Sequence, residues 1–289
     1  MTLTLTNKVN QVNLPNLIII GAMKCGTTSL HYYLSRHPQI SMSQEKELNF
    51  FIREKNWNRG IEWYKSHFTE PVKVQGESSP SYTRYPKWSG VPERMYSIVP
   101  NAKLIYILRD PIQRIISHYI HSYAKGHENR TIGEALANFD NNSYVDCSKY
   151  YMQLRQYLNY FPDSSILVIS LEELSREPYA TLKNVFMHLK IDENIYFKKP
   201  FKPFHSSENK RRKNYWGERI EKLPLIKIIE KMPPQISWHI NQILYWPFSQ
   251  KIHRPILDKS LQNKLADYLR DDINLLRTHT GQSFNDWCV

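Results

Sequence analysis

Short apolar runs alternate with stretches of helical periodicity along most of this chain. An unbroken apolar run at residues 17–20 and the mostly apolar stretches at residues 103–108 and 165–170 predict buried strands, and residues 73–76 predict a shorter strand. Most runs lead into segments whose apolar residues recur every three or four positions, as in a helix packed on one face. Strands that alternate with helices predict an α/β fold, with a central, mostly parallel sheet between two layers of helices.

Capping residues mark several helix boundaries. After the first run, the apolar residues of 27–34 share one helical face, and Pro38 ends the segment. After the second run, Asp110 is predicted to be the N-cap of a helix whose first residue is Pro111. The other helices are predicted at residues 60–68, 92–99, 132–138, 148–160, 179–189 and 261–276.

The chain changes in composition after residue 197. Residues 198–214 carry seven basic side chains, one acidic side chain and two prolines, and therefore predict a basic loop. Residues 223–248 are rich in Ile, Leu and Trp, as in two short helices that form a lid, a substrate wall or an oligomer contact. We expect a single domain over residues 1–289, with a core at 16–190, a basic loop and apolar lid-like insertion at 198–248, and a C-terminal helix and tail at 259–289.

Composition and charge limit the possible size of the core, the type of ligand and the cellular compartment. The 289 residues are 41% hydrophobic, enough for the core of one large α/β domain. The 39 basic and 27 acidic residues give a net charge of +12, which favours an anionic ligand, a nucleic acid or an acidic surface. Three widely spaced cysteines argue against a disulfide framework and a zinc site, and fit a reducing compartment. Because no signal peptide or membrane-spanning run is evident, we expect a cytoplasmic protein without a membrane anchor.

The segment G-A-M-K-C-G-T-T at residues 21–28 carries the first functional signal. It joins a predicted strand to a predicted helix through a turn bounded by Gly21 and Gly26. Backbone N–H groups and the positive end of the helix dipole converge at such a turn, which favours a bound anion. Arg109 likewise comes directly after a predicted strand, the one at residues 103–108. Since ligands of open parallel sheets bind beyond the carboxyl ends of the strands, we expect both segments to serve one site.

The spacing of the two glycines invites comparison with the nucleotide-binding P-loop, G-x-x-x-x-G-K-[ST]. Thr27 occupies the position of the P-loop lysine, and the only lysine of the turn is Lys24. No convincing strand-end aspartate offers a magnesium ligand of the Walker-B type. A kinase or NTPase is therefore the weaker interpretation, and a phosphate-bearing donor that requires no metal is the stronger one.

Two motifs together resemble a known family. Residues 17–34, followed by L-I-Y-I-L-R-D-P-I-Q-R-I-I-S-H-Y from Leu104, are similar to the sulfotransferases that use 3′-phosphoadenosine 5′-phosphosulfate (PAPS). Within that family the chain is most similar to the heparan-sulfate-type and bacterial branch. The resemblance covers residues 16–189 and, more weakly, the final helix and tail. It implies a P-loop-like three-layer fold and the transfer of a sulfuryl group to a hydroxyl or amino group, with PAPS as donor and no metal.

The resemblance assigns the two ends of the donor to different segments. The 5′-phosphosulfate is expected to contact backbone N–H groups, two hydroxyls and one ammonium, contributed by Lys24, Cys25, Gly26, Thr27 and Thr28. Arg109 and Ser117 are expected to hold the 3′-phosphate; Ser117 lies two helical turns beyond Asp110, ~10 Å along the helix. The basic residues Lys210, Arg211 and Arg212 either close over the nucleotide or form only a solvated basic face.

Sulfuryl transfer requires a base for the acceptor and a group that stabilises the leaving phosphate. Lys24 is expected to stabilise the leaving group. By resemblance, Glu47 in K-E-L-N-F-F is the base, a carboxylate that accepts the proton as the new bond to sulfur forms. His31, His118 and His121 are rival bases, ranked lower because the histidine context of the cytosolic branch is missing.

The acceptor is the part that the sequence determines least. Glu77 and Tyr82 in G-E-S-S-P-S-Y, together with His118, are the candidate acceptor contacts. The glycosaminoglycan enzymes often have a lysine after this glutamate, whereas this chain has Ser78. We therefore expect a small metabolite, such as a natural product of secondary metabolism, rather than a saccharide or a lipid. A nucleic-acid-binding role lacks a recognition motif, and the oligomeric state stays open.

Overall fold

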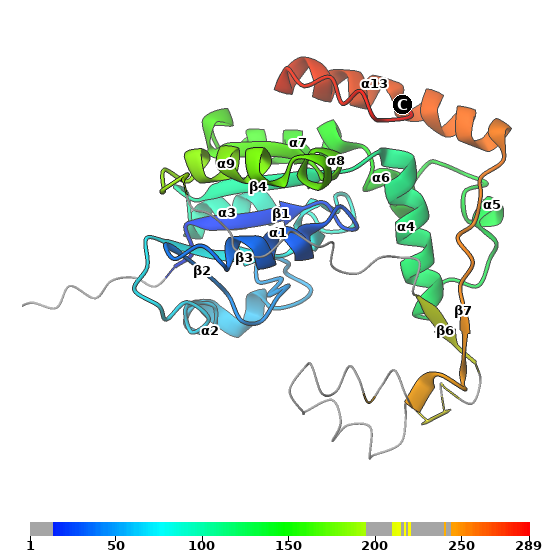
Figure 1. Cartoon of the computed structure of the whole chain (residues 1–289), viewed down its shortest axis with the longest axis horizontal. Helices are drawn as coiled ribbons and strands as arrows, with labels where there is room; N and C mark the ends of the chain where they lie inside the picture. The colour runs from blue at the N-terminus through cyan, green and yellow to red at the C-terminus, as the bar shows by residue number, and fades with distance from the viewer. Residues whose placement is uncertain (1–13, 195–209, 215–216, 218, 221–239, 241–243) are drawn as a thin grey trace, which may run out of the picture. The chain divides into compact units, whose positions relative to one another are not determined.

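The computed structural model describes residues 14–194, 210–214, 217, 219–220, 240 and 244–289 (Figure 1). These residues belong to two compact units, which we describe one at a time. The first unit includes residues 14–108 and 150–194, and the second includes residues 109–149 and the described residues from 210 onward. A single functional domain over residues 1–289 stays a prediction.

The first unit is built on a five-stranded parallel sheet with the strand order β2-β3-β1-β4-β5 (Figure 1). Its strands are β1 (Leu17–Gly21), β2 (Ile40–Met42), β3 (Val74–Ser78), β4 (Lys103–Leu108) and β5 (Ile166–Ser170). The predicted central parallel sheet is confirmed. The apolar runs locate β1, β4 and β5 to within one residue, whereas the three residues of β2 are too few to show a pattern.

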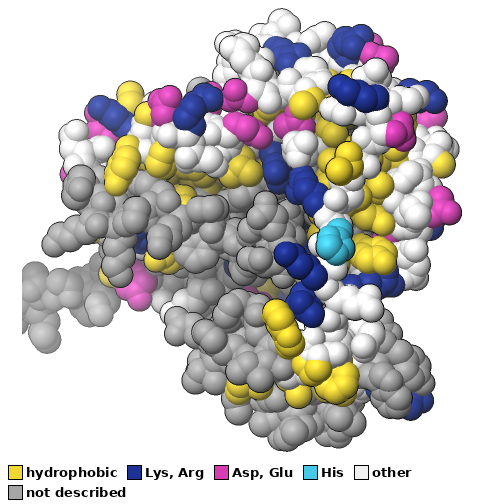
Figure 2. Space-filling model, turned by 45° about the vertical axis from the view of Figure 1, so that its right-hand side comes forward, with side chains coloured by type: hydrophobic (Ala, Val, Ile, Leu, Met, Phe, Trp, Pro, Cys, Tyr) yellow, Lys and Arg dark blue, Asp and Glu magenta, His cyan; other side chains and the backbone are white. Residues whose placement is uncertain are grey.

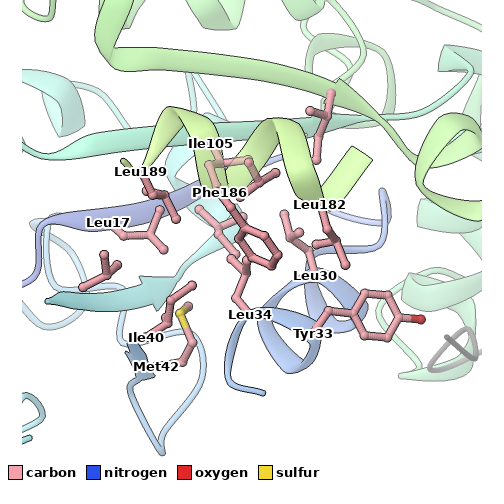
Figure 3. Close-up of a cluster of buried hydrophobic side chains, with 14 of the residues drawn as sticks. Leu17, Leu30, Tyr33, Leu34, Ile40, Met42, Ile105, Leu182, Phe186 and Leu189 are labelled. Atoms are coloured by element: carbon pink, nitrogen blue, oxygen red, sulfur yellow. The ribbon is translucent and has the colours of Figure 1, made fainter. Parts of the chain in front are cut away.

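Helices cover both faces of this sheet. On one face, α1 (Thr27–Leu34) and α9 (Pro178–His188) join β1 and β4 in a buried apolar cluster (Figure 3). Strand side chains alternate between faces, so Tyr106 of β4 points to the other side, where its ring meets Tyr150 of α7 (Tyr150–Leu158). The first unit also contains η1 (Trp57–Arg59), α2 (Gly60–Lys65), η2 (Pro80–Thr83), α3 (Val91–Ile98), η3 (Asp163–Ser165) and α8 (Leu171–Arg176).

The second unit contains four helices and a small antiparallel ribbon. These elements are α4 (Pro111–Ala124), α5 (Ile132–Ala135), α6 (Ser143–Asp146), α13 (Lys259–Thr280), β6 (Arg211–Lys213) and β7 (Ser249–Lys251), all within its described residues. Asp110 caps α4 as predicted, because its Oδ1 accepts a hydrogen bond from the backbone N of Gln113 at 2.8 Å. Its Oδ2 accepts from the backbone N of Cys288 at 2.5 Å, which ties the C-terminal tail to the start of α4.

One sequence-based expectation requires correction. The predicted basic loop is wrong at Arg211–Lys213, which form β6 by pairing with β7, and Arg212 lies opposite Gln250. Composition alone did not reveal this strand, because its partner lies 38 residues further along the chain. The helix predicted at 148–160 is confirmed as α7, and α6 is a separate short helix that ends before it. Residues 198–209 and most of the apolar segment 223–248 lie outside the described residues.

Candidate active site

The turn between β1 and α1 depends on its two glycines. A Cβ atom on Gly21 would lie 1.9 Å from Oγ1 of Thr83, and one on Gly26 would lie 2.6 Å from Cδ1 of Leu171. Gly26 is also the N-cap of α1 and has a left-handed φ of 87°, which glycine adopts without steric cost. Close packing thus requires glycine at both ends of the turn.

The turn lies at the carboxyl edge of the sheet, next to β4. The backbone N of Ala22 donates a hydrogen bond to the carbonyl oxygen of Ile107 at 2.7 Å, which links the turn to the end of β4. The first N–H groups of an α-helix have no acceptor within the helix and point out of its N-terminus. Thr27 and Thr28 open α1 in this way, so their amides lie at the positive end of the helix dipole, where an anion is stabilised.

Lys24 and Cys25 occupy the same turn but in different environments. Lys24 is half-buried and has a left-handed φ of 74°. The side chain of Cys25 is buried, with its Sγ 3.7 Å from Oη of Tyr150. Its backbone N donates to the carbonyl oxygen of Ala22 at 3.1 Å, so this amide already has an acceptor inside the turn. Of these two residues, Lys24 is therefore the better candidate to contact a bound anion.

Glu47 lies on a loop that is anchored to the end of β3. Its backbone N donates to the carbonyl oxygen of Ser78 at 2.9 Å. Its side chain is 48% exposed and lies 3.3 Å from Nζ of Lys46. Because β3 is parallel to β1 and pairs with it, the loop and the turn after β1 emerge at the same edge of the sheet. The carboxylate of Glu47 is thus accessible to a molecule from solvent.

His31 lies on α1 close to the same loop. Its Nδ1 is 2.9 Å from Oγ of Ser78. Burial, reinforced by the positive charge of Lys46, lowers the pKa of His31 to about 4. The imidazole is therefore neutral at pH 7. Its position beside the loop of Glu47 keeps His31 a rival candidate for the base.

Glu77 and Tyr82, two of the predicted acceptor contacts, face each other in the interior of the first unit. Glu77 is 0% exposed and Tyr82 only 2%. Oη of Tyr82 donates to Oε1 of Glu77 at 2.9 Å, and burial raises the pKa of Glu77. Strand β3 continues two residues beyond the predicted segment 73–76, and this extension includes the buried Glu77. Both side chains are thus enclosed, and their contact with an acceptor stays a prediction.

His118, the third predicted acceptor contact, is buried in the second unit. Its Nδ1 lies 3.5 Å from Nη1 of Arg114, and its ring meets that of Tyr144 edge-on. His118 is thus enclosed as well, and its contact with an acceptor stays a prediction.

The second unit gathers several predicted nucleotide-binding residues around α4. Arg109 is half-buried and directly precedes Asp110, while Ser117 is buried in α4. Nζ of Lys210 donates to Nδ1 of His121 at 2.8 Å. His121 lies four residues, about one helical turn, beyond Ser117 on the same face of the helix. The structure therefore brings Lys210 close to the helix that carries Ser117.

The arginines of β6 are held by aromatic rings and oxygen atoms. The guanidinium of Arg212 lies 4.1 Å from the ring centroid of Tyr123, and its Nη1 donates to the carbonyl oxygen of Glu128 at 3.3 Å. The guanidinium of Arg211 lies 4.1 Å from the ring centroid of Trp246. Figure 2 shows Lys and Arg side chains next to one another and beside a histidine on the face that it draws. Arg211 and Arg212 are thus held by contacts within the second unit.

Sequence reasoning missed Tyr64, Ser79 and Thr83. Thr83 packs against Gly21, and the hydroxyls of Tyr64 and Ser79 donate to the carboxylate of Glu77. For Ser79 and Thr83 a signal was available, namely the concentration of hydroxyl side chains directly after a strand. Tyr64 carried no such signal, because it lies on a separate helix 13 residues earlier.

Comparison with known proteins identifies the family. Residues 14–216 match the sequence pattern of the sulfotransferase domain. The chain belongs to the sulfotransferase family. This match confirms the resemblance drawn from residues 17–34 and from the segment that begins at Leu104, and it favours a sulfotransferase over a P-loop kinase.

Two curated sulfotransferases illustrate the relationship. The chain is 35% identical over 201 residues to heparan sulfate glucosamine 3-O-sulfotransferase 5 of Homo sapiens, covering 64% of this chain and 57% of that protein. It is 44% identical over 111 residues to the membrane-associated sulfotransferase kil1 of Dictyostelium discoideum, covering 37% of this chain and 22% of that protein. The chain thus spans roughly half or less of the length of these two relatives.

A solved structure supports the fold. The sulfotransferase from Alicyclobacillus acidocaldarius superposes with a TM-score of 0.67 at 23% identity, covering 94% of this chain and 98% of that one. Together with the parallel sheet, this similarity confirms the predicted P-loop-like three-layer fold. Among the residues that the structure describes, no helix is long and apolar enough to cross a bilayer.

Proposed function

We propose that this chain transfers the sulfuryl group of PAPS to a hydroxyl or amino group of an acceptor. The observation that carries the proposal is the glycine-bounded turn at residues 21–28, held at the carboxyl edge of the sheet by the bond from Ala22 to Ile107. The strand beside it, β4, continues directly into Arg109. Two adjacent strand ends that lead to anion-binding groups suit a donor with phosphates at both ends.

The residues present fit such a donor. The ammonium of Lys24 and the amides and hydroxyls of Thr27 and Thr28 are proposed to bind the 5′-phosphosulfate, and Arg109 and Ser117 the 3′-phosphate. Charge-assisted hydrogen bonds of this kind contribute ~1.5 to 3 kcal/mol each. Lys210, Arg211 and Arg212 are proposed to add positive charge near the nucleotide.

The proposed reaction is a direct displacement at sulfur. The acceptor oxygen or nitrogen forms a bond to sulfur, the bond between sulfur and the 5′-phosphate oxygen breaks, and 3′-phosphoadenosine 5′-phosphate (PAP) leaves. Glu47 takes the proton of the acceptor. Lys24 neutralises the charge that develops on the leaving phosphate. No step requires a metal, and the absence of a metal requirement is part of the proposal.

For the acceptor we propose a small hydroxylated or amino metabolite, and a saccharide is the second candidate. Ser78 in place of a lysine supports the first, because a polyanionic sugar would gain from a cation at that position. The name of the human relative, a heparan sulfate glucosamine sulfotransferase, supports the second. A cytoplasmic location stays a prediction.

The experiment uses the full chain with PAP and PAPS in magnesium-free buffer. Millimolar PAP should raise the melting temperature by several degrees through ligand linkage, and Arg109→Ala should reduce that shift. Glu47→Gln should lower the rate of transfer by about 100-fold or more, to a measurable residual rate, and leave the shift unchanged. Acceptors are sought as products that gain one SO₃ group, in a panel of desulfated heparan oligosaccharides and in metabolite extracts. A wild-type chain that shows neither a shift with PAP nor any transfer would contradict the proposal.

A further inference from the structure

Glu77 lies at the centre of a buried polar ring that the proposed reaction does not use. Its Oε1 accepts hydrogen bonds from Oη of Tyr64 at 2.7 Å and Oη of Tyr82 at 2.9 Å. Its Oε2 accepts from Oγ of Ser79 at 2.7 Å. The partners come from α2, from η2 and from the residue before η2. A fully buried carboxylate is costly, so this arrangement calls for an explanation.

Two of these hydroxyls also accept hydrogen bonds from the loop that carries Glu47. The backbone N of Asn49 donates to Oγ of Ser79 at 2.9 Å, and the backbone N of Phe51 donates to Oη of Tyr82 at 3.4 Å. Each path thus runs from a backbone amide through a hydroxyl to one oxygen of Glu77. An ionised carboxylate only accepts hydrogen bonds, so it turns both hydroxyl protons toward itself and their lone pairs toward the loop.

The loop is held in a conformation that needs such restraint. Glu47 and Asn49 have left-handed φ values of 64° and 49°. Left-handed conformations of residues other than glycine are unfavourable and persist where the surroundings enforce them. Nδ2 of Asn49 donates to the carbonyl oxygen of Glu47 at 2.6 Å, so the restraint on Asn49 reaches Glu47 through one further bond.

We propose that Glu77 is a positioning residue whose two carboxylate oxygens orient the hydroxyls of Ser79 and Tyr82, and thereby fix the backbone of the loop that presents Glu47. The effect on turnover rests on the proposed function, in which Glu47 is the base. The effect on the loop backbone does not depend on that function. This role replaces the direct acceptor contact that the sequence suggests for Glu77.

The chain offers a matched control for this proposal. Ser79→Ala cuts the path to Asn49, Tyr82→Phe cuts the path to Phe51, and Glu77→Gln replaces one accepting oxygen with an amide that only donates. Tyr64→Phe also removes one hydrogen bond to Glu77, but Tyr64 receives no bond from the loop backbone. Its ring stays stacked on that of Phe50, with the centroids 4.3 Å apart and the planes 8° apart.

Amide hydrogen exchange tests the proposal without reference to activity. In the full chain, exchange at Asn49 and Phe51 should accelerate about tenfold or more in Glu77→Gln, because the bond of each amide depends on an oriented hydroxyl. Ser79→Ala should accelerate Asn49 more than Phe51, and Tyr82→Phe should do the reverse. Tyr64→Phe should change neither by more than about threefold. Equal exchange in the wild type and in the single-path variants would overturn the proposal, even if Glu77→Gln failed to fold.

Turnover provides the second readout. Glu77→Gln and Ser79→Ala should lower kcat by about 10- to 100-fold while PAP affinity stays unchanged, because misplacing a reacting group by about 1 Å costs rate of this order. Introduced into Glu47→Gln, Ser79→Ala should cause no further loss. Losses that multiply in the double variant, or an unchanged kcat in Ser79→Ala, would show that Glu77 does not act through Glu47. If the wild type transfers no sulfuryl group, the proposed function fails while the exchange result still decides the positioning.

Discussion

Glu77 in the first unit and Glu128 in the second are both buried glutamates, yet their surroundings move their pKa values in opposite directions. The partners of Glu77 are neutral hydroxyls, and burial raises its pKa. Glu128 is 6% exposed and accepts hydrogen bonds from Nη2 of Arg130 at 2.7 Å and Nε at 2.9 Å. The bonds from Arg130 lower the pKa of Glu128 to about 2.

The two glutamates show that the partners of a buried carboxylate can orient it without stabilising its charge. Hydroxyl groups orient a carboxylate but bring no opposite charge, so the ionisation of Glu77 opposes folding while it directs the surrounding hydroxyls. A guanidinium brings both hydrogen bonds and charge, so the ionisation of Glu128 favours folding. The carbonyl oxygen of Glu128 also accepts a bond from Arg212 of β6. Glu128 therefore has the chemistry of a structural anchor, and Glu77 that of a positioning group.

Truncation of the two glutamates should give the largest effect. Glu77→Ala should lower the free energy of unfolding by about 3–5 kcal/mol, because it leaves a cavity and three buried hydroxyls without their acceptor. Glu128→Ala should cost less, about 2–3 kcal/mol, since its partner Arg130 is 58% exposed and regains water. Urea unfolding at pH 7 measures both values. If Glu128→Ala lowered the free energy of unfolding more than Glu77→Ala, the predicted order of the two variants would be wrong.

Acid titration of stability should show opposite slopes for the two residues. The pKa of Glu128 is depressed from 4.5 to about 2, so its contribution is complete above pH 4.5 and is lost as pH falls toward 2. The loss amounts to at most about 3 kcal/mol, less whatever solvent screens at the exposed Arg130. The pKa of Glu77 is raised, so its ionisation should lower stability as pH rises above 4.5. As pH falls from 7 toward 2, the free energy of unfolding should decrease less in Glu128→Gln than in the wild type, and more in Glu77→Gln. The same pH dependence in both variants would refute the opposite directions of the two pKa shifts.

His31 should add a loss of stability at mildly acidic pH. Its pKa is lowered from 6.5 to about 4, so between these values the unfolded chain binds a proton that the folded chain does not. At pH 5 the folded state should be weaker by about 2 kcal/mol than at pH 7 from this group alone. His31→Gln should remove that difference, measured by urea unfolding at both pH values. An unchanged difference would mean that His31 is not protonated on unfolding in this range.

The exposed pair of Lys46 and Glu47 should give the smallest effect. Their atoms are 3.3 Å apart, but the Glu47 side chain is 48% exposed. Lys46→Ala should therefore change the free energy of unfolding by less than about 1 kcal/mol. It should also raise the pKa of His31, because the charge of Lys46 contributes to lowering it. NMR titration of the imidazole measures this shift, and a downward shift would contradict the arrangement.

The elements that the sequence predicted well are those that carry a local signal. The runs at 17–20, 104–108 and 166–169 are continuous and apolar, so they indicate strands buried on both faces. Asp110 before Pro111 is a local capping signal and fixes the start of α4. The ribbon of β6 and β7 was missed because its two strands are polar, short and far apart in the chain.

In the candidate site, too, the residues of continuous motifs were predictable from sequence and the residues placed by long-range packing were not. The two motifs were sufficient to identify the family, because the turn at residues 21–28 and the strand end at Arg109 are each continuous in sequence. That these segments bind the donor stays a prediction. The placement of Glu77 was not predictable in this way. Its burial depends on Tyr64, Ser79 and Tyr82, which close around it only when α2 and η2 pack against the sheet.

The sequence by itself determined the parallel sheet, the glycine-bounded turn after β1 and the sulfotransferase family, since each depends on short-range patterns of side chains. Only the tertiary structure decided which polar residues meet solvent and which meet one another. It left Glu47 accessible, enclosed Glu77 among hydroxyls and arranged the basic residues of β6 beside α4. Burial and long-range pairing are properties of packed elements, and no stretch of sequence encodes them alone.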